Sequence, residues 1–307
     1  MRTIKLGNSS LEVSEVALGC MRMSDKTVEE ACDIIKTALD VGINFFDHAD
    51  MYGRGKAETI FGEALKVLDI DRDAIYIQSK CGIDVNEGTF NFGKQYILDS
   101  VDGILQRLQT DYIDVLVLHR GDALVDPREV SEAFNILKEN GKVRHFGVSN
   151  HSVIMIDLLK KYLDVDLLVN QVQMSIMHTP SIDYSFNFNN RSALGTDHAA
   201  GMIEYARLND ITLQAWSPFY SGYFEAVFVD NEDYPEINQA MQVIADKYTV
   251  SKEAVAVAWI GRHPAHIQTL IGTMNVDRIR RISKVSDFRL THTEWYDLYK
   301  AAGNVLP

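Results

Sequence analysis

The chain has 307 residues, of which 46% are hydrophobic and 24% are charged, and these proportions are those of a globular protein rather than a disordered one. Its 30 basic and 43 acidic residues give a formal net charge of −13, so nucleic acid is not an expected partner. Cys20, Cys32 and Cys81 are too scattered for a ligand pair or a disulfide framework. With no apolar leader and no apolar run that could span a bilayer, we expect a cytoplasmic protein without a membrane partner.

Eight short apolar runs alternate with amphipathic stretches along the chain. The runs predicted as strands cover residues 16–20, 43–47, 74–80, 113–119, 142–150, 167–173, 211–217 and 267–272. The stretches predicted as helices cover residues 24–42, 56–68, 94–108, 127–141, 152–163, 199–208, 237–248 and 276–283. Such continuous runs are typical of parallel strands that are covered on both faces. The alternation predicts an α/β fold, a (β/α)8 TIM barrel forming a single domain over residues 1–307.

An open doubly wound sheet is the alternative architecture, but no GxGxxG fingerprint follows any of the predicted strands. Three segments lie outside the repeat. Residues around Gly7 and Asn8 predict an N-terminal β-hairpin that plugs the bottom of the barrel, and residues 291–303 predict an extra C-terminal helix. Residues 175–198 show no clear period, and a loop of that length is typical of either a functional lid or a disordered insert.

The predicted strands tend to end in a polar or charged residue, and in a closed barrel these ends meet at one mouth. The residues concerned are Asp47, Lys80, His119, Ser149, Asn150, Gln171, Trp216 and Ser217. Barrel enzymes build their active sites at this C-terminal face. A single polar strand end means little, but the convergence of six ends predicts a functional site.

Asp47 and Lys80 carry opposite charges near a partly dry mouth, so we expect them to pair. Tyr52 follows five residues after Asp47, in the loop over the mouth. A nearby ammonium, and a hydrogen bond from His119, should lower the pKa of Tyr52 and make it a proton donor or acceptor. This set suits protonation of a carbonyl oxygen and does not suit acyl transfer. A structural ion pair beside a rim tyrosine is the alternative.

These residues lie in motifs that resemble a known family. GINFFDHADMYG, IQSKCGI, YIDVLVLHR, GKVRHFGVSN, VNQVQ and QAWSPF occur in the order and spacing of the aldo-keto reductases, and the resemblance runs from about residue 1 to the final AAGNVLP. It is strongest to a bacterial branch of oxidoreductases. The resemblance implies a catalytic tetrad of Asp47, Tyr52, Lys80 and His119. It also implies an NADP(H)-dependent oxidoreductase that reduces small aldehydes or ketones to alcohols, with Tyr52 as the general acid.

The resemblance further implies a nicotinamide cofactor that is bound in an extended form across the mouth. Ser149, Asn150 and Gln171 would bind its carboxamide, Trp216 would stack on the ring, and the segment after Trp216 would meet the pyrophosphate. A pairing of Arg278 with a 2′-phosphate favours NADP, although NAD is possible. The expected cofactor-binding residues are Gly19, Met21, Ser149, Asn150, Gln171, Trp216, Ser217, Phe219, Gly222, Gly272, Thr273, Asn275 and Arg278.

Two other functions stay open at this stage. One is an NADP-binding, redox-sensing regulatory module of the same fold with slow turnover. The other is a metal-dependent barrel hydrolase, but the segment from Asp47 to Asp50 lacks the further histidine ligands that such enzymes need, and we expect no metal. Arg120 could meet an anionic substrate or balance Asp122 or Asp126, and we expect the pairing. The sequence leaves the oligomeric state open.

Overall fold

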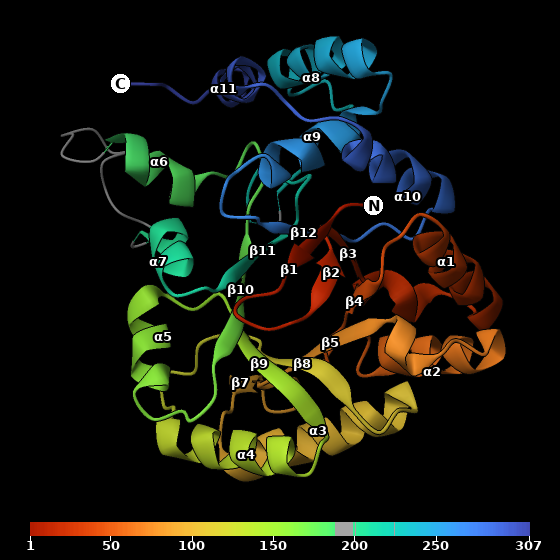
Figure 1. The fold of residues 1–307 in the computed structure, drawn as a ribbon, viewed down its shortest axis with the longest axis vertical. Coiled ribbons are helices and arrows are strands. Elements are labelled where there is room, and N and C mark those ends of the chain that lie inside the picture. Colours follow the sequence, from red (N-terminus) through yellow and green to blue (C-terminus); the bar gives the residue numbers. More distant parts are fainter. Residues whose placement is uncertain (188–198, 200, 224) are drawn as a thin grey trace.

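The computed structural model describes residues 1–187, 199, 201–223 and 225–307. At its centre is a closed barrel of parallel strands in the order β10-β11-β12-β3-β4-β5-β8-β9, with helices around the outside (Figure 1). The barrel strands are β3 (Val16–Gly19), β4 (Phe45–Asp47), β5 (Tyr76–Cys81), β8 (Ile113–Leu118), β9 (Val143–Ser149), β10 (Leu167–Gln173), β11 (Thr212–Trp216) and β12 (Gln268–Ile271). Each strand coincides with one predicted run, which confirms the (β/α)8 fold.

Apart from the helices over residues 180–187 and 252–261, which were not predicted, the helices around the barrel begin and end close to the predicted stretches. They are α1 (Val28–Asp40), α2 (Lys56–Leu68), α3 (Lys94–Leu108), α4 (Pro127–Glu139), α5 (Val153–Lys160), α6 (Pro180–Asn187), α7 (Met202–Leu208), α8 (Pro235–Tyr248), α9 (Lys252–Gly261), α10 (Val276–Ser283) and α11 (His292–Ala301). Short 3-10 helices cover Met21–Asp25, Arg72–Ala74 and Lys284–Asp287. Local signals fix several starts, since Thr27 and Glu30 form a reciprocal capping box before α1, and Asp126 caps α4.

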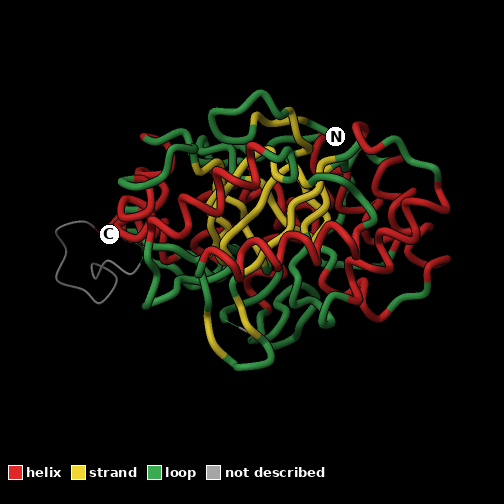
Figure 2. The backbone as a smooth tube through the Cα atoms, turned by 90° about the horizontal axis from the view of Figure 1, so that it is seen from below, coloured by secondary structure: helices red, strands yellow, loops and turns green. Residues whose placement is uncertain are grey.

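Two small hairpins lie at opposite ends of the barrel, the one beside the N-terminus being β1–β2 (Figure 2). It pairs β1 (Thr3–Lys5) with β2 (Glu12–Ser14), as predicted. Its Leu6 and Val13 pack against Phe45 and the other apolar side chains inside the barrel, so the hairpin closes the bottom. The second hairpin, β6 (Ile83–Asp84) with β7 (Thr89–Phe90), follows β5 and was not predicted.

The predicted C-terminal helix is α11, and it packs against α9. The rings of Trp295 and Trp259 stack 4.8 Å apart, and each indole nitrogen donates a hydrogen bond to the backbone carbonyl of the other residue. The segment 175–198 is partly helical, because α6 lies within it, and residues 188–198 are outside the described part of the chain. Among the described helices, none has the length and apolar character needed to cross a membrane.

Candidate active site

Asp47 and Lys80 form a buried ion pair inside the mouth of the barrel. Strand alternation turns both side chains inward from the ends of β4 and β5. Lys80 Nζ donates to Asp47 Oδ2 over 2.6 Å and to the carbonyl of His48 over 2.8 Å, which satisfies a side chain that is fully buried. Burial lowers the pKa of Lys80, but the Asp47 carboxylate and the Tyr52 hydroxyl raise it by more. Lys80 therefore stays an ammonium, and the predicted pairing is confirmed.

Tyr52 is the third member of this contact, since Lys80 Nζ donates to its hydroxyl over 3.2 Å. The expectation of a lowered pKa is wrong for this structure. Burial raises the pKa of Tyr52 above its ordinary value, and the nearby Lys80 charge only partly opposes the rise. The sequence could show that Lys80 lies near, but not how fully the fold buries the phenol. Tyr52 is therefore a protonated hydroxyl at neutral pH, held against a cation.

His119 follows the last residue of β8 and lies across the mouth from Tyr52. The two rings meet edge to face with centroids 5.9 Å apart, and among the described contacts no hydrogen bond joins them, so that expected bond is absent here. The Nδ1 atom of His119 is buried without a partner. Burial, and then the charges of Lys80 and Arg120, lower the pKa of His119 well below its ordinary value. The imidazole is therefore neutral at pH 7.

Ser149, Asn150 and Trp216, predicted to hold the nicotinamide, lie together beside His119. Asn150 Nδ2 donates to Ser149 Oγ over 2.7 Å and to the carbonyl of His119 over 3.4 Å. Trp216 Nε1 donates to Asn150 Oδ1 over 3.2 Å. Asn150 and the next predicted residue, Ser217, have φ of +56° and +53°, an uncommon region for residues with a Cβ. Such backbone conformations cluster at functional sites.

Gln171, by contrast, turns its amide away to the barrel interior. Its Nε2 donates to Asp47 Oδ1 over 3.0 Å and to Gln214 Oε1 over 3.2 Å. Gln78 donates to the same two acceptors over 2.6 and 2.9 Å. Asp47 is therefore held by an ammonium on one oxygen and by two amides on the other. The carboxamide contact expected of Gln171 stays a prediction.

The segments after β11 and β12 carry the other predicted cofactor residues, with Gly19 and the half-exposed Met21 close by after β3. In the segment that holds Phe219, the carbonyl of Gly222 accepts a hydrogen bond from Gln173 Nε2. Asn275 caps α10 by accepting from the backbone of Arg278, and Thr273 Oγ1 accepts from the backbone of Asn275. Arg278 is not a free cation, however, because its Nε lies 3.4 Å from a carboxylate oxygen of Glu253.

Comparison with known proteins shows the family of this chain. The model of the Aldo/keto reductase family matches residues 15–302. The chain belongs to the aldo/keto reductase family. It is 32% identical to "Uncharacterized oxidoreductase YcsN" of Bacillus subtilis over 313 residues, and equally to a "6-dehydroglucose reductase" of Agrobacterium fabrum, with 98% of each chain covered in both cases. A crystal structure of an aldo/keto reductase from Klebsiella pneumoniae "in complex with NADP and acetate" has a TM-score of 0.78 at 22% identity, covering 97% of this chain and 94% of that one. The last likeness shows the shared fold.

The sequence analysis missed a glutamine chain inside this aldo/keto reductase barrel. From Gln214, Nε2 donates to Gln268 Oε1, and Gln268 Nε2 donates to the carbonyl of Ser14 at the bottom hairpin, each over 2.8 Å. With Gln78 and Gln171, these amides connect Asp47 to the opposite end of the barrel. The signal was available for Gln78, which lies two residues before Lys80 and so on the same face of β5.

Arg22 was also missed. It lies after β3, and its Nη1 donates to the carbonyl of Gly272 over 2.9 Å, while Nη2 donates to the hydroxyl of Tyr220 over 3.1 Å. Arg22 thus joins three mouth segments that are far apart in sequence and puts a cation between the two expected phosphate regions. Nothing in the sequence around residue 22 indicates these partners.

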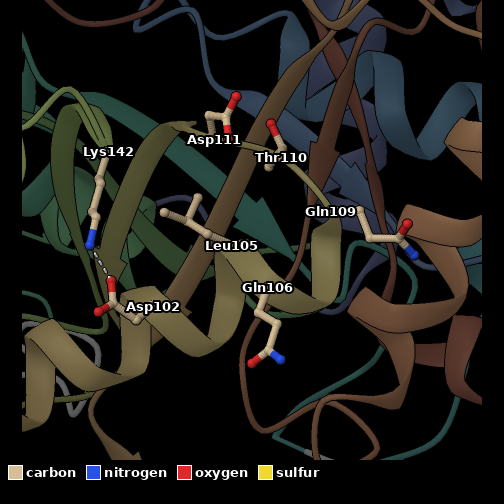
Figure 3. A pocket seen from close by; sticks show the side chains of 7 residues that line it. All are labelled: Asp102, Leu105, Gln106, Gln109, Thr110, Asp111 and Lys142. Carbon is tan, nitrogen blue, oxygen red and sulfur yellow. Dashed lines mark hydrogen bonds and ion pairs between the residues drawn. The ribbon is translucent and has the colours of Figure 1, made fainter.

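The His48 side chain and one surface hollow of the aldo/keto reductase lie outside this site. His48 is buried with its ring edge against Phe61, 4.5 Å between centroids, and in the described part of the chain no group of three or more metal-ligand side chains is arranged to hold an ion. A surface hollow lies near the C-terminal end of α3, where Lys142 Nζ contacts Asp102 Oδ1 over 2.5 Å (Figure 3). Because Lys142 immediately precedes β9, this hollow is at the end of the barrel opposite the mouth.

Proposed function

We propose that this chain is an NADP(H)-dependent carbonyl reductase that converts small aldehydes or ketones to alcohols, with Tyr52 as the general acid. The observation that carries the proposal is the line of contacts from Asp47 through Lys80 to the Tyr52 hydroxyl in the barrel mouth. Membership of the aldo/keto reductase family and the 6-dehydroglucose reductase relative support a reductase.

In the proposed proton transfer, each residue at the mouth has its own role. Tyr52 keeps its proton at neutral pH, because the ordinary pKa of a phenol is about 10 and burial raises the pKa of Tyr52 further, so the hydroxyl carries a proton to donate. When the proton leaves, the Lys80 ammonium at 3.2 Å stabilises the phenolate that remains, and Asp47 holds the ammonium in place. The neutral His119 offers an N–H to orient the carbonyl oxygen. The carbonyl carbon gains a hydride, its oxygen gains the Tyr52 proton, and solvent returns a proton to Tyr52.

The residues at the mouth fit a nicotinamide dinucleotide. NADPH, when bound, supplies the hydride. Ser149 and Asn150 would hold the carboxamide and Trp216 would stack on the ring, while Arg22 would neutralise phosphate charge. The capped N-terminus of α10 would favour the adenosine phosphate, and the NADP in the Klebsiella pneumoniae structure supports the same cofactor.

The test supplies the purified protein with NADPH that is deuterated at the transferred position of C4 and with a panel of small aldehydes and ketones. We expect NADPH absorbance to fall as alcohol forms in equal amount, with one deuterium on the carbinol carbon of the product. NADH run in parallel reports the cofactor preference, which we expect to favour NADPH. If no member of the panel oxidises NADPH above the rate without protein, the proposed function is wrong.

A further inference from the structure

Arg120 directly follows His119 at the end of β8, and its side chain lies over the mouth. The guanidinium carbon is 5.8 Å from the ring centroid of Trp216 and 5.6 Å from that of Tyr223, and Nη2 donates to the Tyr223 hydroxyl over 3.4 Å. After burial and the Lys80 charge, the Arg120 charge is the third cause that lowers the pKa of His119. Aromatic side chains from two other segments therefore hold this cation beside the catalytic imidazole.

This cation lacks an acidic partner among the described residues, and the expected pairing with Asp122 or Asp126 is wrong. The carboxylate of Asp122 accepts from the backbones of Phe92 and Leu124 instead. Asp126 is used to cap α4. Both aspartates accept hydrogen bonds from backbone N–H groups, and the sequence spacing did not reveal these partners.

Arg120 differs from two other half-buried arginines of this chain, which contact a carboxylate. Arg72 contacts Asp114 and Arg107 contacts Glu58, so two other half-buried arginines of this chain have a carboxylate partner. In a chain with 43 acidic residues, a half-buried guanidinium without a described carboxylate partner is available to an external anion. A planar guanidinium fork matches a carboxylate with two parallel hydrogen bonds.

We propose that Arg120 selects carbonyl substrates that carry a carboxylate, binding that carboxylate while the carbonyl lies between Tyr52 and His119. The inference rests on the proposed reductase function and names its substrate class. The chemical step is unchanged: the carbonyl carbon gains a hydride and the oxygen gains the Tyr52 proton. Arg120 takes no part in that transfer and acts on substrate affinity, so its effect belongs mainly in KM.

The test compares pairs of substrates that differ in charge but little in shape. The first pair is 4-formylbenzoate with 4-formylbenzamide, and the second is 4-oxobutanoate with 4-oxobutanamide. We expect the wild type to prefer the carboxylate of each pair. Arg120→Gln should lower kcat/KM for the carboxylates by about 10- to 100-fold, mostly through KM, and change it for the amides by less than about threefold. Arg120→Lys should keep part of the preference, because it keeps the charge without the fork.

Arg128→Gln is the matched control, because Arg128 is an exposed arginine at the start of α4, just after the loop that follows Arg120. It should leave the preference unchanged, and the melting temperature of each variant reports whether it is folded. Calorimetric titration of 4-methylbenzoate, which has neither a carbinol nor an aldehyde to react, into the protein with NADP gives a readout without turnover, and binding should weaken in Arg120→Gln. If Arg120→Gln lowers kcat/KM equally for the carboxylates and the amides, or for neither, the inference is overturned. The reductase function still holds in that case, provided that the wild type reduces the amides. If no aldehyde is reduced, both fail.

Discussion

Two ion pairs with buried carboxylates contact the barrel strand β5, one on each of its faces. Lys80 points inward and contacts Asp47 over 2.6 Å. The preceding residue, Ser79, points outward and donates over 2.6 Å to Glu58, which contacts Arg107 over 2.7 Å between α2 and α3. Both carboxylates are buried, and both cations lie within hydrogen-bond distance of them.

The difference between the pairs is the third partner. Lys80 also contacts the ionisable hydroxyl of Tyr52, whereas the third partner of Glu58 is the hydroxyl of Ser79, which does not titrate near neutral pH. A buried charge pair therefore indicates chemistry only where it leads on to a group that can exchange a proton in the mouth. The Glu58–Arg107 pair should act on stability, and the Asp47–Lys80 pair on catalysis.

The largest expected effect comes from Lys80→Met. Removing the ammonium leaves no cation to stabilise the phenolate of Tyr52, so kcat/KM for aldehyde reduction should fall by about 10²- to 10⁴-fold. Steady-state NADPH oxidation measures it, with circular dichroism as the check on folding. A folded variant within tenfold of wild type would show that the inner pair is no more catalytic than the outer one.

Glu58→Gln should show the opposite pattern. It removes the charge that faces Arg107 but keeps a similar shape, and the free energy of unfolding should fall by about 1–3 kcal/mol. Urea denaturation measures this change. In the same protein kcat/KM should stay within about threefold of wild type, and a loss as large as that of Lys80→Met contradicts the division between the two pairs.

Asp50 interacts with charges of both pairs, and its ionisation makes the stability of the protein depend on pH. It lines a cavity of about 430 Å³ with Arg54, Tyr96 and Arg107, and its Oδ1 is buried without a hydrogen bond. Burial, and then the Glu58 carboxylate, raise the pKa of Asp50 from 3.8 to about 7. Because the folded pKa exceeds the unfolded one, this group's contribution to stability is complete below about pH 4 and is lost as pH rises through 7.

Asp50→Asn should therefore remove a fall in stability between pH 4 and 7 whose slope approaches about 1.4 kcal/mol per pH unit. The variant should be more stable than wild type at pH 8 and should differ least at pH 4. Urea denaturation at a series of pH values gives the comparison. Parallel stability curves for the two proteins would show that the Asp50 carboxyl is ionised at its ordinary pKa.

The barrel, and the meeting of Asp47, Lys80 and His119 at its mouth, could be predicted because their signals are local. Each strand is a continuous apolar run, and a polar residue at its end must face the common mouth of a closed barrel. Helix α9 was missed because Ala254–Ile260 is buried on every side, which removes the amphipathic period. The short β6–β7 hairpin is too brief to show an alternation.

The rest of the site depended on tertiary packing. The direction of the Tyr52 pKa shift follows from how deeply the fold buries the phenol. Arg120 has no carboxylate partner among the described residues because backbone N–H groups bind Asp122 and Asp126 instead. The inward direction of Gln78 could have been predicted from the sequence, because period-two alternation places it on the same face of β5 as Lys80. Its partners across the barrel required the register, in which Gln171 pairs with Gln214 and Gln214 with Gln268.

The acid role of Tyr52 is tested most directly by comparing Tyr52→Phe with Tyr96→Phe in single turnovers with NADPH and a reactive aldehyde. Tyr96 is the matched control, because it lines the neighbouring cavity and its pKa is also raised, to about 12, yet it lies outside the tetrad. The rate of hydride transfer should fall by about 10²-fold or more in Tyr52→Phe, with NADPH still bound, and should change little in Tyr96→Phe. Hydride transfer within a few-fold of wild type in Tyr52→Phe would contradict the assignment of Tyr52 as the proton donor.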